Sequence, residues 1–238
     1  MLTLFFLPDL GVDNTINVEG DEAHHAIKVM RLKSGEEILL ADGSGAWARV
    51  SVDEIAKKSF TTKVLERGIA QVIAPELIVV QALMKSERAK EAIELLTVAG
   101  ATKIIPWQSE RSIAKWQEDL GAKWMVTSIA AAKQARRLTV PEIEAPISTD
   151  QIVKRFGGAT NLLVLHESAT IKISSAALEL TPGPIVIVIG PEGGISGAEL
   201  GRFASAGGTI VLLGNEVFRS VHAGFAALSA LSALTGRW

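Results

Sequence analysis

From about residue 76 to the end of the chain, short apolar runs alternate with segments in which apolar residues recur every three or four positions. The runs are nearly continuous in Val, Ile and Leu, as strands buried on both faces are, whereas the longer segments have helical spacing. Strands that alternate with helices form parallel sheets covered on both faces. We therefore expect an α/β domain, with strands over residues 76–83, 101–108, 161–168, 184–190 and 209–214 and helices over residues 86–99, 123–138, 196–207 and 218–236.

Polar residues and glycines mark the ends of two of these helices. Ser86 is placed to cap the first helix, and Gly100 follows its last turn. Ser196 and Glu199 have the spacing of a capping box, which predicts that a helix starts directly after Ser196.

Residues 1–68 have a different pattern, in which short alternating segments are separated by Gly and polar residues. Val50 and Val52 alternate with polar neighbours, and Asp42-Gly43 is a turn signal between two such segments. This region is typical of a small antiparallel sheet or barrel. The change in pattern predicts two domains, residues 1–70 and 71–238.

The composition excludes several classes of protein. With 238 residues, 48% of them hydrophobic and 21% charged, the chain is not of the disordered type. The absence of Cys excludes disulfide frameworks and thiolate chemistry, and it is compatible with a reducing cytoplasm. The first residues do not resemble a signal peptide, and no apolar run reaches the roughly 18 residues of a membrane span.

The formal net charge of −2 gives no general attraction to nucleic acid, so a polyanion would have to be bound by local basic patches. A solvated charged surface is the simpler explanation for each cluster of basic residues. The candidates for phosphate contacts are Lys28, Arg31, Lys33, Lys85, Arg88, Arg111, Arg136 and Arg137.

Three loops follow strands of the expected parallel sheet and are the candidates for a binding pocket. They are residues 166–168, 190–194 and 214–216. Ligands of open parallel sheets bind beyond the carboxyl ends of strands, so the three loops could converge on one pocket. The middle loop is rich in glycine, which lets a ligand approach the backbone, although a tight structural turn would have the same composition.

Familiar nucleotide motifs are missing from this region. Neither GxGxxG nor GxxxxGK[ST] occurs, and Glu192 would repel a phosphate. The middle loop is better suited to an adenine ring, a ribose or a sulfonium. The four histidines lack metal-site spacing, so we expect no metal.

Two features of the last helix have a structural and a functional interpretation. Its many Ala, Gly and Ser residues allow close packing, within the core or in a dimer. Arg219, before this helix, could bind a phosphate or an enolate-like oxygen, or could be an ordinary surface residue.

These segments, in the same order along nearly the whole chain, resemble the RsmE-type small-subunit ribosomal RNA (uracil-N3)-methyltransferases of the SPOUT superfamily. The resemblance is carried by residues 24–45, by residues 81–112 with the triplet Ser109-Glu110-Arg111, and by Gln134 and Arg137. The most specific match is IGPEGGISGAEL, residues 189–200, and the terminal motif lies in residues 212–231.

The resemblance implies a PUA-like N-terminal RNA-binding domain and a C-terminal domain with a deep trefoil knot. It also implies a homodimer that takes a methyl group from S-adenosylmethionine and acts on 16S ribosomal RNA. The cofactor residues that it implies are Leu165, His166, Ile189, Gly190, Glu192, Gly194, Leu213, Gly214, Val217, Phe218 and Arg219.

The terminal motif departs from the family's usual pattern. Arg219 is retained, but Val221 replaces an acidic residue and His222 replaces a hydroxyl residue. A role of that acid cannot be carried over to this chain.

The leading hypothesis is methyl transfer to N3 of a uridine, with three candidate catalytic residues. Arg219 would stabilise the negative charge that develops on the uracil oxygens, and Glu192 or His222 would accept the N3 proton. Because N3 lies on the Watson–Crick edge, the uridine must be unpaired, which favours the assembled small subunit as substrate. A non-catalytic RNA-binding protein and a dinucleotide-dependent enzyme are the competing hypotheses.

Overall fold

The computed structural model describes residues 2–158 and 161–238 and divides the chain into two compact units. Unit 1 consists of Met1–Val72 and Ala132–Val140, and unit 2 of Ile73–Ala131 and Pro141–Trp238. Nothing in the pattern of residues indicated that the short segment from Ala132 belongs with the first unit.

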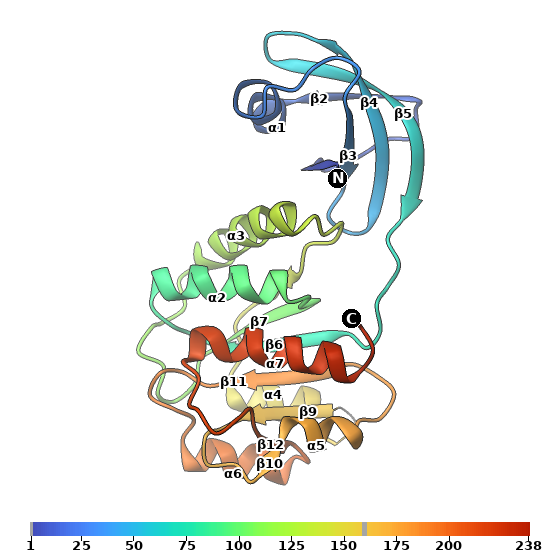
Figure 1. Ribbon diagram of the computed structural model, residues 1–238. Coiled ribbons are helices and arrows are strands. Elements are labelled where there is room, and N and C mark those ends of the chain that lie inside the picture. Colours follow the sequence, from blue (N-terminus) through green and yellow to red (C-terminus); the bar gives the residue numbers. More distant parts are fainter. Residues whose placement is uncertain (1, 159–160) are drawn as a thin grey trace. The chain divides into compact units, whose positions relative to one another are not determined.

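Unit 1 is built around a curled five-stranded sheet (Figure 1). The strand order is β1-β3-β4-β5-β2. The expected antiparallel pairing holds for β2 to β5, but the edge strand β1 pairs in parallel with β3. The elements are β1 (Thr3–Phe6), β2 (Thr15–Glu19), α1 (Gly20–His24), the π-helix η1 (His25–Val29), β3 (Glu37–Ala41), β4 (Ala46–Ile55) and β5 (Ser59–Ile69).

Alternation along the strands gives this sheet its core. Val50 and Val52 are buried as their pattern predicts, and they pack with Phe5, Leu40 and Phe60. The turn between β3 and β4 lies at the expected Asp42-Gly43 position. One oxygen of the Asp42 carboxylate accepts hydrogen bonds from three successive backbone N–H groups, those of residues 44 to 46.

Unit 2 contains a seven-stranded parallel sheet in the order β10-β12-β9-β11-β6-β7-β8. This confirms the α/β class expected for the larger domain. Its elements, of which only α3 has its last turn in unit 1, are β6 (Leu77–Ala82), α2 (Ser86–Val98), β7 (Lys103–Trp107), α3 (Leu120–Ala135), β8 (Glu142–Ile143), α4 (Thr149–Phe156), β9 (Asn161–Leu165), β10 (Ile171–Lys172), α5 (Ile173–Leu178), β11 (Ile185–Ile189), α6 (Gly197–Ser205), β12 (Thr209–Leu212) and α7 (Ser220–Leu234).

Helices cover both faces of this sheet, and each face has its own apolar core. Helices α2, α5 and α7 contribute buried residues to the core on one face, and α4 and α6 contribute to the core on the other. The central strands β6 and β11 are buried over their whole length, which explains their unbroken Val, Ile and Leu runs. The trefoil knot that the resemblance implies stays a prediction.

The helix boundaries differ from the expected ones by up to three residues. Helix α3 begins and ends three residues earlier than residues 123–138, because Gly121 is tolerated in the first turn and Arg136, at φ 53°, leaves the helical conformation. The N-cap of α2 is Lys85, whose carbonyl accepts the first helical hydrogen bond from Ala89, so Ser86 is the first helical residue. Gly100 follows α2 with φ +95°, as expected of a residue that ends a helix.

Candidate active site

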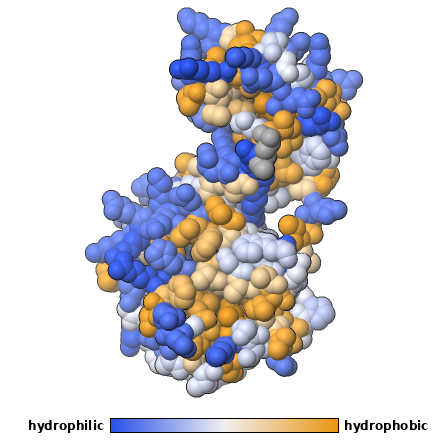
Figure 2. Space-filling view, viewed as in Figure 1, coloured by the Kyte–Doolittle hydropathy of each residue, from blue (hydrophilic) through white to orange (hydrophobic). Residues whose placement is uncertain are grey.

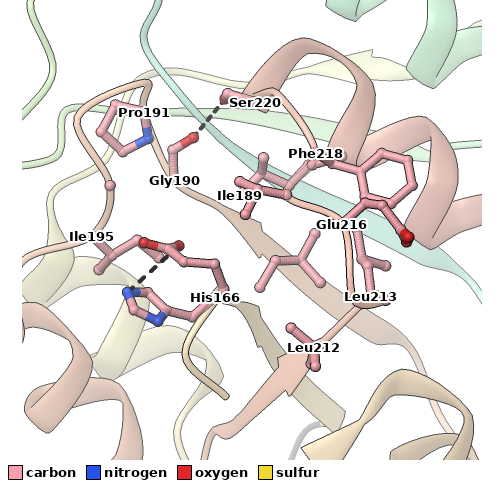
Figure 3. Close-up of a pocket in the computed structure, with 16 residues that line it drawn as sticks. His166, Ile189, Gly190, Pro191, Ile195, Leu212, Leu213, Glu216, Phe218 and Ser220 are labelled. Carbon is pink, nitrogen blue, oxygen red and sulfur yellow. Dashed lines mark hydrogen bonds and ion pairs between the residues drawn. The ribbon is translucent and has the colours of Figure 1, made fainter. Parts of the chain in front are cut away.

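A pocket lies where three neighbouring strands of unit 2 end (Figure 3). Strands β12, β9 and β11 are adjacent in the sheet and parallel, so the loops that follow them leave the same edge. The start of α7 closes the pocket with Ser220 and Ala223. The expected convergence of residues 166–168, 190–194 and 214–216 on one pocket is therefore confirmed.

Glycines shape the wall that follows β11. A Cβ atom built on Gly190 would lie 2.7 Å from Cγ1 of Ile195, which is closer than packed carbon atoms approach. Gly194 has a φ of +74°, a conformation that L residues rarely adopt. The loop from residue 190 to residue 194 thus needs glycine for space at one end and for backbone conformation at the other.

A hydrogen bond ties the glycine loop to α7. The Ser220 hydroxyl donates to the Gly190 carbonyl oxygen at 2.5 Å, and both residues line the pocket (Figure 3). Behind them, the side-chain amide of the buried residue Gln81 lies 3.4 Å from the Ser220 hydroxyl. Sequence reasoning missed Ser220 and Gln81, because their contact joins residues that are 139 positions apart.

The polar groups of the pocket are mostly acceptors. His166 Nδ1 accepts a hydrogen bond from the Ser168 backbone N–H at 3.2 Å, and its Nε2 lies 3.9 Å from a Glu167 carboxylate oxygen. Glu216 adds a second carboxylate, and the described lining contains no Lys or Arg. The remaining lining is largely aliphatic. Such a site favours a ligand that is apolar in part and carries hydroxyl groups or positive charge.

Nine of the eleven residues expected to contact the cofactor line this pocket. They are Leu165, His166, Ile189, Gly190, Gly194, Leu213, Gly214, Val217 and Phe218. The other two, Glu192 and Arg219, are neighbours of lining residues in the sequence but are not part of the lining.

The three candidate catalytic residues lie around the pocket rather than in its lining. Glu192 forms an ion pair with Arg88 at 3.3 Å, and His222 lies 3.4 Å from a carboxylate oxygen of Glu91. Arg219 is exposed and occupies the N-cap position of α7. Their catalytic roles stay predictions.

The candidate basic residues are divided between the two units. In unit 2, Arg111 donates a hydrogen bond to the Gly193 carbonyl oxygen at 3.2 Å, which brings its guanidinium to the glycine loop. In unit 1, Arg31 and Arg136 both have positive φ, 56° and 53°. The remaining candidates in unit 2 are Lys85 and Arg88, and those in unit 1 are Lys28, Lys33 and Arg137.

Two structural findings bear on metals and membranes. The described residues contain no cluster of three His, Cys, Asp or Glu side chains that could hold a metal ion. None of the helices in the described part of the chain has the length and hydrophobicity of a membrane span.

Comparisons with known proteins relate both units to RNA modification. A family model described as an RNA methyltransferase domain matches residues 73–232, and one described as an RNA methyltransferase PUA domain matches residues 18–65. The chain is 39% identical to the ribosomal RNA small subunit methyltransferase E of Mycobacterium tuberculosis, over 98% of this chain and 90% of that protein. The Bacillus subtilis protein of the same name is 28% identical over 92% of this chain and 90% of its own length.

The architecture also matches a solved structure. The ribosomal RNA small subunit methyltransferase E from Neisseria gonorrhoeae, described as bound to S-adenosyl methionine, superposes with a TM-score of 0.89 over 98% of both chains. With 24% identity, this match supports the fold alone.

Proposed function

The chain belongs to the ribosomal RNA small subunit methyltransferase E family, and we propose that it transfers a methyl group from S-adenosylmethionine to N3 of a uridine in 16S ribosomal RNA. The observation that carries the proposal is the pocket that the three strand-end loops of unit 2 form together. A dinucleotide-dependent enzyme is excluded by the family.

The residues of the pocket fit S-adenosylmethionine. Gly190 and Gly194 leave two positions of the pocket wall without side chains, the aliphatic side chains suit an adenine ring, and Glu167 and Glu216 can accept hydrogen bonds from hydroxyl or amino groups. When bound, the cofactor supplies an electrophilic methyl group on a sulfonium. Transfer then requires alignment with a nucleophile and neither a metal ion nor a covalent enzyme intermediate.

The protein's own residues must make N3 of uridine nucleophilic. As the N3 proton leaves, negative charge spreads onto O2 and O4 of the uracil, where the Arg219 guanidinium would stabilise it. Glu192 or His222 would accept the proton, directly or through water. Val221 is buried, so the position at which the family usually has an acid contributes packing in this chain.

Substrate RNA would contact both units. We assign residues 1–70 to RNA recognition and residues 71–238 to catalysis, with the exposed basic residues as phosphate contacts. The target uridine must be unpaired or turned out of its helix to react at N3. The assembled small subunit holds its RNA in a defined fold and is therefore the proposed substrate, which places the reaction in the cytoplasm.

We propose that two copies of the chain form a homodimer through α7, which would cover the hydrophobic surface of unit 2. Much of the surface in the region of α7 is hydrophobic (Figure 2), and Leu234 and Phe218 are 48% and 43% exposed. The Ala and Ser residues along the helix would let a second copy approach closely. We propose the trefoil knot of the resembling family as the topology beneath this surface.

The function is tested with purified protein, S-adenosylmethionine carrying a labelled methyl group, and small ribosomal subunits that lack the modification. We expect binding of S-adenosylmethionine by titration calorimetry and transfer of label to the 16S RNA of assembled subunits. Binding of RNA without any binding of the cofactor would instead support the non-catalytic RNA-binding protein, which the departures at Val221 and His222 favour.

A further inference from the structure

Glu199 is a buried carboxylate outside the pocket. It lies at the third position of α6 with 4% of its surface exposed. Among the described residues, no Lys, Arg or His forms an ion pair with it. A buried charge without a cationic partner has to be stabilised by hydrogen-bond donors.

Three donors from three segments meet this carboxylate. Oε1 accepts the backbone N–H of Glu110 at 3.0 Å and the hydroxyl of Thr149 at 2.9 Å. Oε2 accepts the backbone N–H of Ser196 at 3.2 Å. Only the Ser196 contact belongs to the capping box, so a helix cap accounts for one oxygen of Glu199 and leaves the other to long-range contacts.

The contact with Thr149 is itself fixed by the core. The Thr149 hydroxyl accepts a hydrogen bond from the indole N–H of Trp107 at 3.1 Å, and Trp107 is fully buried against Phe203. With its hydroxyl oxygen occupied as an acceptor, Thr149 directs its own proton to Glu199. The carboxylate is therefore anchored to the packed core on one side.

On its other side, the carboxylate holds the segment that carries Arg111. Glu110, whose N–H it accepts, directly precedes Arg111, and the Arg111 guanidinium donates to the Gly193 carbonyl. Contact here is close, because a Cβ atom on Gly193 would lie 3.4 Å from Cβ of Arg111. The Arg111 side chain is exposed, and its Nη1 lies 3.9 Å from the position a Cβ would take on Gly194, which lines the pocket.

We propose that Glu199 is a positioning residue that acts through Arg111. Its carboxylate holds the Glu110–Arg111 segment against the glycine loop, so that the Arg111 guanidinium stands at the rim of the pocket and binds a phosphate of the RNA beside the target uridine. The inference rests on the proposed function and adds to it a phosphate contact whose position is set from inside the protein.

The isosteric substitution Glu199→Gln tests this assignment. A glutamine has one acceptor oxygen, and its NH2 group would face one of the three donors, so the segment is no longer held from both sides. We expect a rise of about tenfold in the KM for RNA, with the dissociation constant of S-adenosylmethionine unchanged within twofold, and faster hydrogen exchange at the Glu110 amide. Thr149→Val removes one donor and should give a smaller change in the same direction.

The partner variant is Arg111→Ala, and its double variant with Glu199→Gln is decisive. If Glu199 acts through Arg111, the double variant binds RNA no more weakly than Arg111→Ala alone. Asn161→Ala is the matched control, because Asn161 also joins separate segments by side-chain hydrogen bonds and lies at the end of β9 that is away from the pocket. It should lower the melting temperature and leave the KM for RNA unchanged.

Three results would overturn the assignment: additive losses in the double variant, equal weakening of cofactor and RNA binding, or a lower melting temperature with an unchanged KM. RNA affinity is also measured without turnover, by fluorescence anisotropy. If the unsubstituted protein transfers no methyl group, the proposed function fails, while the binding comparison still decides whether Glu199 controls Arg111.

Discussion

The pocket of unit 2 and the basic loop of unit 1 are both assigned to binding, but the chain builds them differently. The pocket is formed by three strand ends, and its shape depends on glycines and packed apolar side chains. The basic loop, residues 28–33, starts in the last turn of the π-helix η1, and Lys28, Arg31 and Lys33 are exposed. On this assignment, the pocket would select its ligand by shape and the basic loop would bind by charge.

This difference predicts how each surface responds to substitution. A pocket defined by close packing should no longer bind its ligand when a substitution enlarges one side chain in its wall, because the neighbouring atoms cannot move away. At an exposed basic loop, each basic residue removed should weaken RNA binding by a similar amount, and each of these losses should depend on the salt concentration. Substitutions in the two regions can therefore separate cofactor binding from RNA binding.

The largest expected effect is that of Gly190→Val. Since even a Cβ atom would lie 2.7 Å from Ile195, the valine side chain should displace the loop and abolish binding of S-adenosylmethionine. Titration calorimetry measures this loss. Gly201→Ala, within α6 and with open space at its Cβ position, is the control and should keep full binding. Normal binding by Gly190→Val would mean that the cofactor lies elsewhere.

Arg219→Ala should have the next largest effect, on the chemical step. Loss of a donor that stabilises developing negative charge lowers kcat by roughly 10²-fold. Single-turnover methyl transfer to small subunits measures it, and Arg219→Lys should restore part of the rate. If kcat is unchanged and only cofactor binding weakens, Arg219 contacts the cofactor and not the uracil.

In unit 1, Arg31→Ala should weaken RNA binding by about tenfold and leave the affinity for S-adenosylmethionine unchanged. The slope of log affinity against log salt should decrease by about one unit, because one phosphate contact is lost. Filter binding over a range of salt concentrations measures both quantities. Lys58→Ala removes an exposed basic residue between β4 and β5 and serves as the control of equal charge. An equal loss of RNA affinity in this control would mean that Arg31 contributes only through the net charge of the protein and not through a specific phosphate contact.

The smallest effect concerns stability and its dependence on pH at the turn of Asp42. Burial raises the pKa of Asp42, but the hydrogen bonds that its carboxylate accepts from residues 44 to 46 together lower the pKa by more, so that it lies below its ordinary value. Because the folded-state pKa is below the unfolded one, the stabilisation is present above the unfolded pKa and is lost as the pH falls through the folded one.

Asp42→Asn should therefore lower the free energy of unfolding by about 1 kcal/mol at neutral pH. The difference between the two proteins should shrink as the pH falls below about 4. Denaturant unfolding across this range measures the difference. A difference that does not change with pH would mean that the charge of Asp42 does not stabilise the turn.

The sequence predicted the parts of the fold that depend on local periodicity. The five long strands of unit 2, the turn at Asp42 and the capping box of Ser196 and Glu199 follow from the spacing of neighbouring residues, and the structure confirms them. The two-residue strands β8 and β10 and the short helix α5 were not predicted, because two to six residues contain too little periodicity.

The candidate pocket was predictable because topology gathers the ends of parallel strands, whatever their distance along the chain. The contacts that stabilise this pocket could not be predicted from the sequence. Glu199 was expected as a cap and Gln81 was not singled out, because their partners, Glu110 and Ser220, are distant in sequence. Local patterns indicate that a residue caps a helix, whereas its hydrogen bonds to distant segments are visible only in the folded chain.

The central claim is methyl transfer to uridine N3 from a cofactor held at the strand-end loops. Its most direct test is to incubate unmodified small subunits with the protein and labelled S-adenosylmethionine, digest the 16S RNA to nucleosides and identify the labelled one by chromatography and mass spectrometry. We predict labelled 3-methyluridine, absent when Gly190→Val replaces the unsubstituted protein. Label on a ribose oxygen or on another base would contradict the claim.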